Sequence, residues 1–161
     1  MEIDAPEAEG LQKLRVVVDS GTGECAMDPD MAPGNEVVEI EASRRGAHYR
    51  GPGGEKIYKK GQQRIGMMLR GGLTSRMTFN SAKVRKPLLA VSSIADKGNC
   101  TVFGPKGAWI IPAGAAGLDE LLAFVEAIVG KIGLTRENGV YHLPAWLIPH
   151  SPKPPFHRRG A

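Results

Sequence analysis

The sequence predicts a mostly β protein with one amphipathic helix near its C-terminus. Short runs rich in branched and aromatic residues recur at roughly ten-residue spacing, which is typical of a β-barrel or β-sandwich. Turns rich in Gly and Pro separate these runs, and the chain has no internal repeat. Only residues 118–132 depart from the pattern, because their apolar side chains fall at helical spacing.

The first expected strand, residues 14–18, is a β-branched run that leads into a tight turn. Residues 37–41 alternate apolar and charged side chains, as a half-buried strand does. Residues 47–50 and 55–58 flank a Gly/Pro cluster, so they predict a hairpin with a deformable tip. Further apolar runs predict the remaining strands, at residues 63–69, 73–79, 87–91, 100–103 and 109–111, with a last one near 138–141.

Residues 118–132 predict an amphipathic helix of about four turns. Its apolar side chains form one stripe: Leu118, Leu121, Leu122, Val125, Ile128, Val129 and Ile132. Such a stripe more often packs on the core of its own domain than on a partner, and dimerisation is its second use.

Length and composition fit one soluble domain with terminal extensions. The chain has 161 residues, of which 42% are hydrophobic and 24% charged. Residues 1–12 are expected to be a flexible acidic leader, residues 13–147 the folded domain, and residues 148–161 an unfolded basic tail rich in Pro. No apolar run reaches the roughly 18 residues of a membrane span, and the N-terminus lacks a secretory signal pattern. A cytoplasmic protein, or a fragment cut from a longer polyprotein, is therefore expected.

The cysteines and histidines show no ligand spacing. Cys25 and Cys100 have no CxxC partner, and the four histidines are scattered. No metal site and no other cofactor is therefore expected. Two reduced, partly buried thiols are favoured over a disulfide between the two cysteines.

The net charge of +4 is unevenly distributed. Residues 1–43 hold 11 acids and 2 bases, whereas residues 44–86 hold 12 bases and 1 acid. The basic block either binds nucleic acid or forms a solvated face that pairs with the acidic segment of this chain or of a partner. Because no aromatic residues are interleaved to stack on bases, the solvated face is favoured.

The sharpest chemical signal is the run of residues 16–23, Val-Val-Val-Asp-Ser-Gly-Thr-Gly. A carboxylate at the end of an apolar strand, here Asp19, is costly unless something uses or pairs it. The Ser20 hydroxyl can bond to nearby backbone, and Gly21 lets a substrate or a second backbone come close. An ordinary strand-to-turn junction would show the same three residues.

An aspartic protease needs those properties. Two carboxylates meet across a symmetric turn and share one proton, because both cannot ionise at close range. The charged carboxylate takes a proton from the attacking water, and the protonated one donates to the scissile carbonyl. The Asp-Ser-Gly motif occurs once in the chain, so the second aspartate must come from a second copy in a two-fold dimer.

Over residues 14–147 the chain resembles the retroviral-type aspartic proteases, most closely the copia-type retroelement protease. Four segments carry the resemblance in the family's order. They are the catalytic turn at residues 18–24, the glycine-tipped flap at 49–57, the stretch 87–94 followed by Lys97-Gly98 and Val102-Phe103, and the segment 138–143 with its Gly-x-Tyr-x-Leu pattern.

The resemblance implies a fold, an activity and a set of site residues. The fold would be a retropepsin-like closed barrel half with a flap, and residues 13–147 would be the protease domain. The activity would be endopeptidase cleavage of its own retroelement polyprotein by a homodimer, in the cytoplasm or within a retroelement particle. Catalysis would involve Asp19, Ser20 and Gly21. Substrate would contact Thr22, Gly23, Gly51, Pro52, Gly53, Gly54, Leu88, Leu89 and Ala90.

The chain departs from the family in three places. Leu88-Leu89-Ala90 stands where classical members have two hydrophobic residues and a glycine, the Gly-Arg-Asp/Asn that often follows is absent, and residues 118–132 resemble an insertion. Two alternatives therefore stay open. One is a catalytically inactive dimerisation or peptide-binding remnant of the same fold, and the other is a nucleic-acid-binding module built on the basic block.

Overall fold

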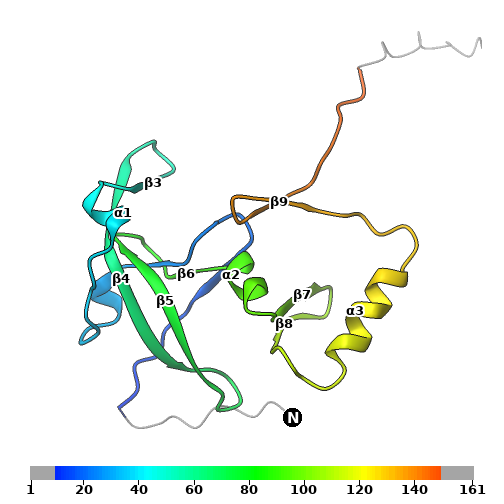
Figure 1. Cartoon of the computed structure of the whole chain (residues 1–161), viewed down its shortest axis with the longest axis horizontal. Helices are drawn as coiled ribbons and strands as arrows, with labels where there is room; N and C mark the ends of the chain where they lie inside the picture. Colours follow the sequence, from blue (N-terminus) through cyan, green and yellow to red (C-terminus); the bar gives the residue numbers. More distant parts are fainter. Residues whose placement is uncertain (1–9, 150–161) are drawn as a thin grey trace, which may run out of the picture.

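The computed structural model describes residues 10–149, and its main element is a curled six-stranded sheet that forms half of a barrel (Figure 1). The prediction of a mostly β protein is confirmed. In spatial order, the strands are β1 (Val17–Asp19), β6 (Leu88–Ala90), β2 (Ala26–Met27), β5 (Thr74–Ala82), β4 (Lys56–Met68) and β3 (His48–Arg50).

The sheet mixes parallel and antiparallel pairs. β1 runs parallel to β6, with Asp19 opposite Ala90. β2 is antiparallel to β6 and parallel to β5, where Ala26 lies opposite Asn80. β4 and β5 form a long antiparallel hairpin with a register shift at Lys59/Gly61, and such a bulge increases strand twist and helps the sheet to curl.

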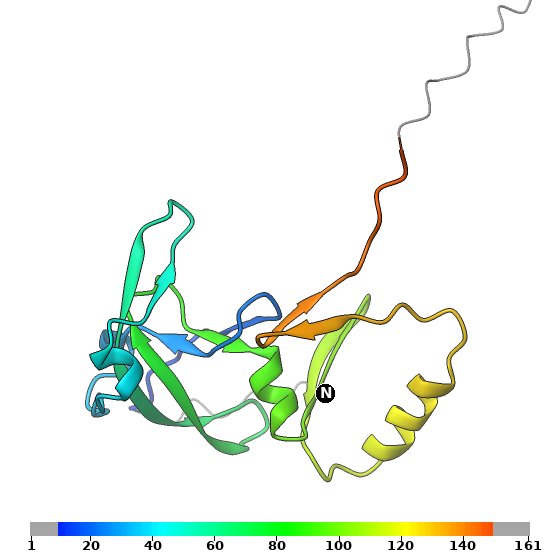
Figure 2. The same ribbon diagram turned by 45° about the horizontal axis from the view of Figure 1, so that its top comes forward.

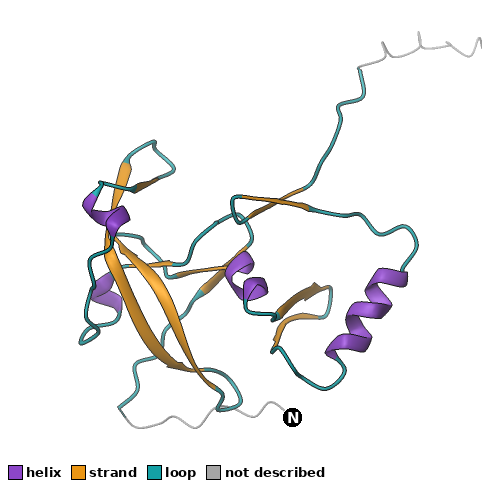
Figure 3. Ribbon diagram, in the orientation of Figure 1, coloured by secondary structure: helices purple, strands orange, loops and turns teal. Residues whose placement is uncertain are grey.

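Two smaller hairpins lie outside the main sheet (Figure 3). One joins β7 (Cys100–Gly104) to β8 (Gly107–Ile111), and the other joins β9 (Thr135–Glu137) to β10 (Val140–His142). Asn138 and Gly139 link β9 to β10 with positive φ angles of 49° and 75°. A two-residue hairpin loop needs this backbone shape, which explains the Asn-Gly pair.

The helices are short. They are η1 (Pro29–Met31), α1 (Glu41–Arg44), α2 (Val91–Asp96) and α3 (Leu118–Ala127). Within residues 10–149, no helix has the length and apolar character to cross a membrane.

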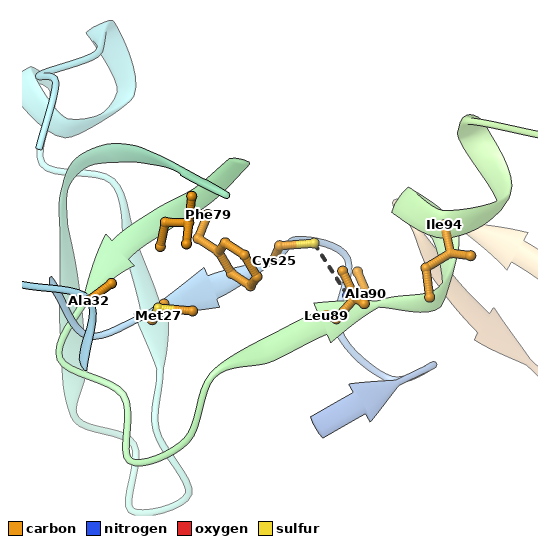
Figure 4. Close-up of a cluster of buried hydrophobic side chains, with 8 residues drawn as sticks. Cys25, Met27, Ala32, Phe79, Leu89, Ala90 and Ile94 are labelled. Carbon is orange, nitrogen blue, oxygen red and sulfur yellow. Dashed lines mark hydrogen bonds between the residues drawn. The ribbon is translucent and has the colours of Figure 1, made fainter. Parts of the chain in front are cut away.

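The hydrophobic core lies along the curled sheet, and α2 contributes Ile94 at one end of it (Figure 4). Phe79 and Met27 are fully buried, and the alternation along β5 sends Met77 to the same side as Phe79. The buried cluster comprises Cys25, Met27, Ala32, Ile65, Phe79, Leu89, Ala90 and Ile94.

Several expected elements differ in the structure. The first strand begins at Val17 rather than at residue 14, and the strands expected at residues 55–58 and 63–69 are one continuous strand, β4. Residues 37–41 were expected to be a strand, but only Val38 forms a bridge, to Gln62, before α1 begins at Glu41. The C-terminal helix ends at Ala127 rather than at residue 132, because the backbone is already extended at Ile128. Two β-branched residues and then Gly130 follow there, and both residue types disfavour helix.

The apolar stripe of α3 does not pack on the core, contrary to expectation. Of the helical part of the stripe only Leu118 is buried, whereas Leu122 is 45% exposed and Val125 42% exposed. Figure 2 shows α3 standing away from the main sheet, connected by loops on both sides.

Both cysteines are free, Cys25 buried and Cys100 partly buried. The acidic leader and the basic tail fall almost entirely outside the described residues, which begin at Gly10 and end at Pro149.

Candidate functional site

The predicted catalytic turn begins where β1 ends. Asp19 is the last residue of the strand and is half-buried, while Ser20 and Gly21 are exposed. The Gly21 N–H donates a hydrogen bond of 2.7 Å to Asp19 Oδ1, and the Thr22 hydroxyl donates to the Glu24 carbonyl at 3.0 Å. The structure thus presents the carboxylate at the edge of the fold, with one oxygen held by the backbone of its own turn.

The β9–β10 hairpin packs against this turn. The Tyr141 N–H donates to the Ser20 carbonyl at 3.2 Å. A Cβ placed on Gly139 would lie 2.8 Å from the Gly23 carbonyl oxygen and 3.0 Å from the Gly23 Cα. Glycine is therefore needed on both sides of the contact, and the close approach fixes the far end of the Asp19 turn.

The predicted substrate-contacting residues Leu88, Leu89 and Ala90 form the strand β6, which pairs with β1 beside the turn. Leu88 is half-buried, whereas Leu89 and Ala90 belong to the core, with Ala90 fully buried. The Ala90 N–H donates to Cys25 Sγ at 3.4 Å (Figure 4). Of these three residues, only Leu89 lines the large cleft described below, and the Ala90 side chain packs on the core rather than facing solvent.

The predicted flap is the β3–β4 hairpin. Its tip holds the predicted residues Gly51, Pro52, Gly53 and Gly54, of which only Gly51 is partly covered. The tip is closed by hydrogen bonds of 2.9 Å from the Gly51 N–H to the Glu55 carbonyl and from the Gly54 N–H to the Gly51 carbonyl. Gly54 has a φ of 81°, a conformation in which other residues are strained.

A polar cluster that the sequence did not predict joins the Asp19 turn to the base of the β3–β4 hairpin. Glu24 Oε2 accepts hydrogen bonds from the Tyr49 hydroxyl at 3.0 Å and from Asn80 Nδ2 at 3.1 Å. It also forms an ion pair with Lys59, whose ammonium lies 4.7 Å from the centre of the Tyr49 ring. Gln62 extends the cluster by donating to Asn80 Oδ1 at 3.1 Å.

The cluster shifts the titration of Tyr49. Burial raises the pKa of the Tyr49 phenol well above its ordinary value, and the negative charge of Glu24 raises it further, against a lowering by the Asn80 hydrogen bond. The phenol therefore stays neutral and donates to Glu24 over the physiological pH range.

We predict that Tyr49 makes the fold sensitive to alkali. Because folding raises its pKa, its contribution to stability is present below the unfolded value of about 10 and is lost as pH rises. The free energy of unfolding of Tyr49→Phe should therefore fall less between about pH 8 and about pH 11 than that of the wild type. Urea unfolding at both pH values measures this. Tyr58→Phe, at an exposed site, is the control, and an equal fall in all three proteins would contradict the prediction.

Part of the basic block pairs with the acidic segment, as the solvated-face interpretation expects. Besides Lys59–Glu24, Arg44 pairs with Glu39 and Arg45 with Glu41. The last two pairs are exposed, so each adds little to stability. No group of three or more His, Cys, Asp or Glu side chains in the described part of the chain is arranged to hold a metal ion.

A cleft of about 510 Å³ begins at the end of the Asp19 turn, at Gly23 and Glu24. It continues between β5 on one side and α2 with β8 on the other, and polar and apolar side chains both line it.

The comparisons of the chain with family models, with curated proteins and with solved structures found no match.

Proposed function

We propose that the chain is an aspartic endopeptidase of the retropepsin type that is active as a homodimer. The observation that carries the proposal is the placement of Asp19, a carboxylate at the end of a strand on an open glycine turn. The parallel pairing of β1 with β6 and the glycine-tipped hairpin at residues 51–54 support it, because both follow the order of the family that the sequence resembles.

In the proposed reaction, Asp19 of each copy faces the other across the two-fold axis and the pair carries one proton. The ionised carboxylate removes a proton from a water molecule, whose oxygen attacks the scissile carbonyl carbon. The protonated carboxylate donates to the carbonyl oxygen and gives a neutral tetrahedral intermediate. Collapse of this intermediate breaks the C–N bond as the amine leaves with a proton, so no cofactor is required.

The residues around Asp19 have supporting roles in this proposal. Gly21 leaves room for the substrate backbone, and the tip at Gly53 and Gly54 closes over the peptide and excludes water. The Glu24 cluster ties the base of that hairpin to the catalytic turn through Tyr49 and Lys59, so closure and catalysis share one rigid support.

We predict that specific activity falls on dilution, because one chain holds half of the proposed site. Activity per mole on a quenched peptide library should drop as the protein is diluted through its dimer dissociation constant. A control with two copies joined by a flexible linker should keep its activity, since the second copy stays at high effective concentration. Undiminished activity of the unlinked chain, with a monomer in sedimentation, would refute the dimeric site.

A further inference from the structure

The strand β5 has a free edge that no strand covers in the described part of the chain. β2 pairs with β5 only at Asn80 and Ser81, the C-terminal end of the strand. Towards its N-terminal end, β5 pairs with β4 alone.

The hydrogen-bond pattern shows which backbone groups lie on that edge. Gln62 exchanges two hydrogen bonds of 2.8 Å with Val38, away from β5, and its partner Asn80 donates to the Cys25 carbonyl at 2.9 Å, away from β4. Along an antiparallel ladder, hydrogen-bonded pairs alternate with non-hydrogen-bonded pairs, and the β4–β5 register has no further shift. The pairs 64–78, 66–76 and 68–74 are therefore non-hydrogen-bonded pairs, as 62–80 is. The N–H and C=O groups of Thr78, Arg76 and Thr74 point outward, at the free edge.

The cleft of about 510 Å³ runs beside this edge. Thr74 and Thr78 line one side of it, and Ile94, Lys97 and Ile110 are among the residues that line the other. The space thus holds unpaired backbone donors and acceptors on one wall and side chains on the other, which is what an added strand requires.

The side chains around the edge differ on its two faces. Met77 and Phe79 point to the core side, whereas Arg76 projects from the opposite face of the hairpin, diagonal to Arg64. Both arginines are exposed, as is Lys97 at the cleft, and none of the three forms a salt bridge within residues 10–149. Glu24 is the acidic residue among those that line the cleft, and it is already paired with Lys59.

We infer that the free edge of β5 binds an extended peptide segment as an added strand, with acidic side chains alternating with apolar ones. Its backbone bonds to Thr74, Arg76 and Thr78. Its apolar side chains face the Met77 side, and its acidic side chains face Arg76 and Arg64. This site takes a partner peptide at a place other than Asp19 and does not depend on peptide cleavage.

The charge of the edge favours an acidic segment over a second copy of β5. Edge-to-edge pairing of two copies would bring the basic side chains at residues 64 and 76 of one chain near those of the other. Basic side chains on an edge strand oppose such self-pairing, while the same charges attract a strand of opposite sign.

The test uses a synthetic peptide of about six residues that alternates Glu and Val, titrated into the full chain. Binding should slow hydrogen exchange at the Thr74, Arg76 and Thr78 amides about tenfold or more and leave Ser75 and Met77 little changed, since those already bond to β4. A peptide alternating Lys and Val should bind weakly. Repeating the titration with Asp19→Asn makes the result independent of peptide cleavage.

Two N-methylated peptides sharpen the test, because an added strand turns every second amide towards β5. One is methylated at its Glu amides and the other at its Val amides, and only one of them should bind. Arg76→Glu should weaken binding about threefold or more, and less so at high salt, because Arg76 faces the acidic side chains of the added strand. Lys106→Glu, exposed in the β7–β8 turn, is the matched control and should bind as the wild type does.

Three results would overturn the inference. The acidic peptide does not bind, or both methylated peptides bind equally, or binding leaves the three edge amides unprotected. Protection that appears without peptide and grows with protein concentration would likewise overturn it, by assigning the edge to an interface between copies.

Discussion

Replacing Asp19 with Asn is expected to abolish peptide cleavage while the fold is kept. The amide has nearly the same size and can still accept the Gly21 N–H, so the turn should retain its shape. It can neither remove a proton from water nor share one with a second carboxylate. The rate should therefore fall by at least about 10²–10⁴-fold, the contribution typical of a positioned acid or base.

Asp30→Asn is the matched control, since Asp30 is an exposed aspartate in η1, within the acidic segment of residues 1–43. Both variants should show the circular dichroism of the wild type. Cleavage by Asp19→Asn at the wild-type rate would reject the aspartic-protease proposal. Wild-type protein that binds peptides without cutting them would instead favour the inactive, peptide-binding remnant.

Local sequence signals predicted the individual strands well and their arrangement poorly. The Gly/Pro cluster at residues 51–54, flanked by the runs 47–50 and 55–58, predicted the β3–β4 hairpin, because a hairpin is a local structure. The parallel contact of β1 with β6 joins Val17 to Leu88, and no pattern in either run specifies it. The resemblance to a family, rather than periodicity, led us to expect these two strands in one half-barrel.

The C-terminal helix shows the limit of periodicity. The apolar spacing continues to Ile132, but spacing alone carries no signal for the end of a helix. The β-branched pair before Gly130 is the local feature that disfavours helix there. The same spacing suggested packing on the core. Burial of α3 depends on the loops that place it, and these hold it away from the sheet.

The turn after β1 could be predicted because its residues are contiguous. The cluster that supports it could not, because Tyr49, Lys59 and Asn80 reach Glu24 across separations of 25, 35 and 56 residues. Glu24 is the first residue after the glycine turn, but its neighbours are ordinary strand residues with no motif of their own. Only the sheet order, with β2 beside β5 and β4 next to it, brings them together.

Replacing Gly23 with Ala is expected to damage both stability and the proposed activity, because this glycine is where the β9–β10 hairpin meets the Asp19 turn. A Cβ on Gly23 would collide with the Asn138 carbonyl oxygen and also lie 3.8 Å from Val140 Cγ2. The obstacle is backbone, held in a two-residue loop that has little freedom to move. The hairpin must shift away, at a cost of about 1–3 kcal/mol, which is typical of overpacking.

The shift would also loosen the hydrogen bond from the Tyr141 N–H to the Ser20 carbonyl, so the turn that carries Asp19 would lose its support. We expect kcat to fall more than tenfold as the unfolding midpoint falls, because small misplacements of a catalytic group are costly. Gly66→Ala is the control: it also adds one methyl group, but to an exposed glycine of β4 with no heavy atom within 4 Å of the new Cβ, and it should leave both quantities near the wild-type values. Thermal unfolding and peptide cleavage of the three proteins measure the effect. If Gly23→Ala is as stable and active as Gly66→Ala, the hairpin does not hold the catalytic turn.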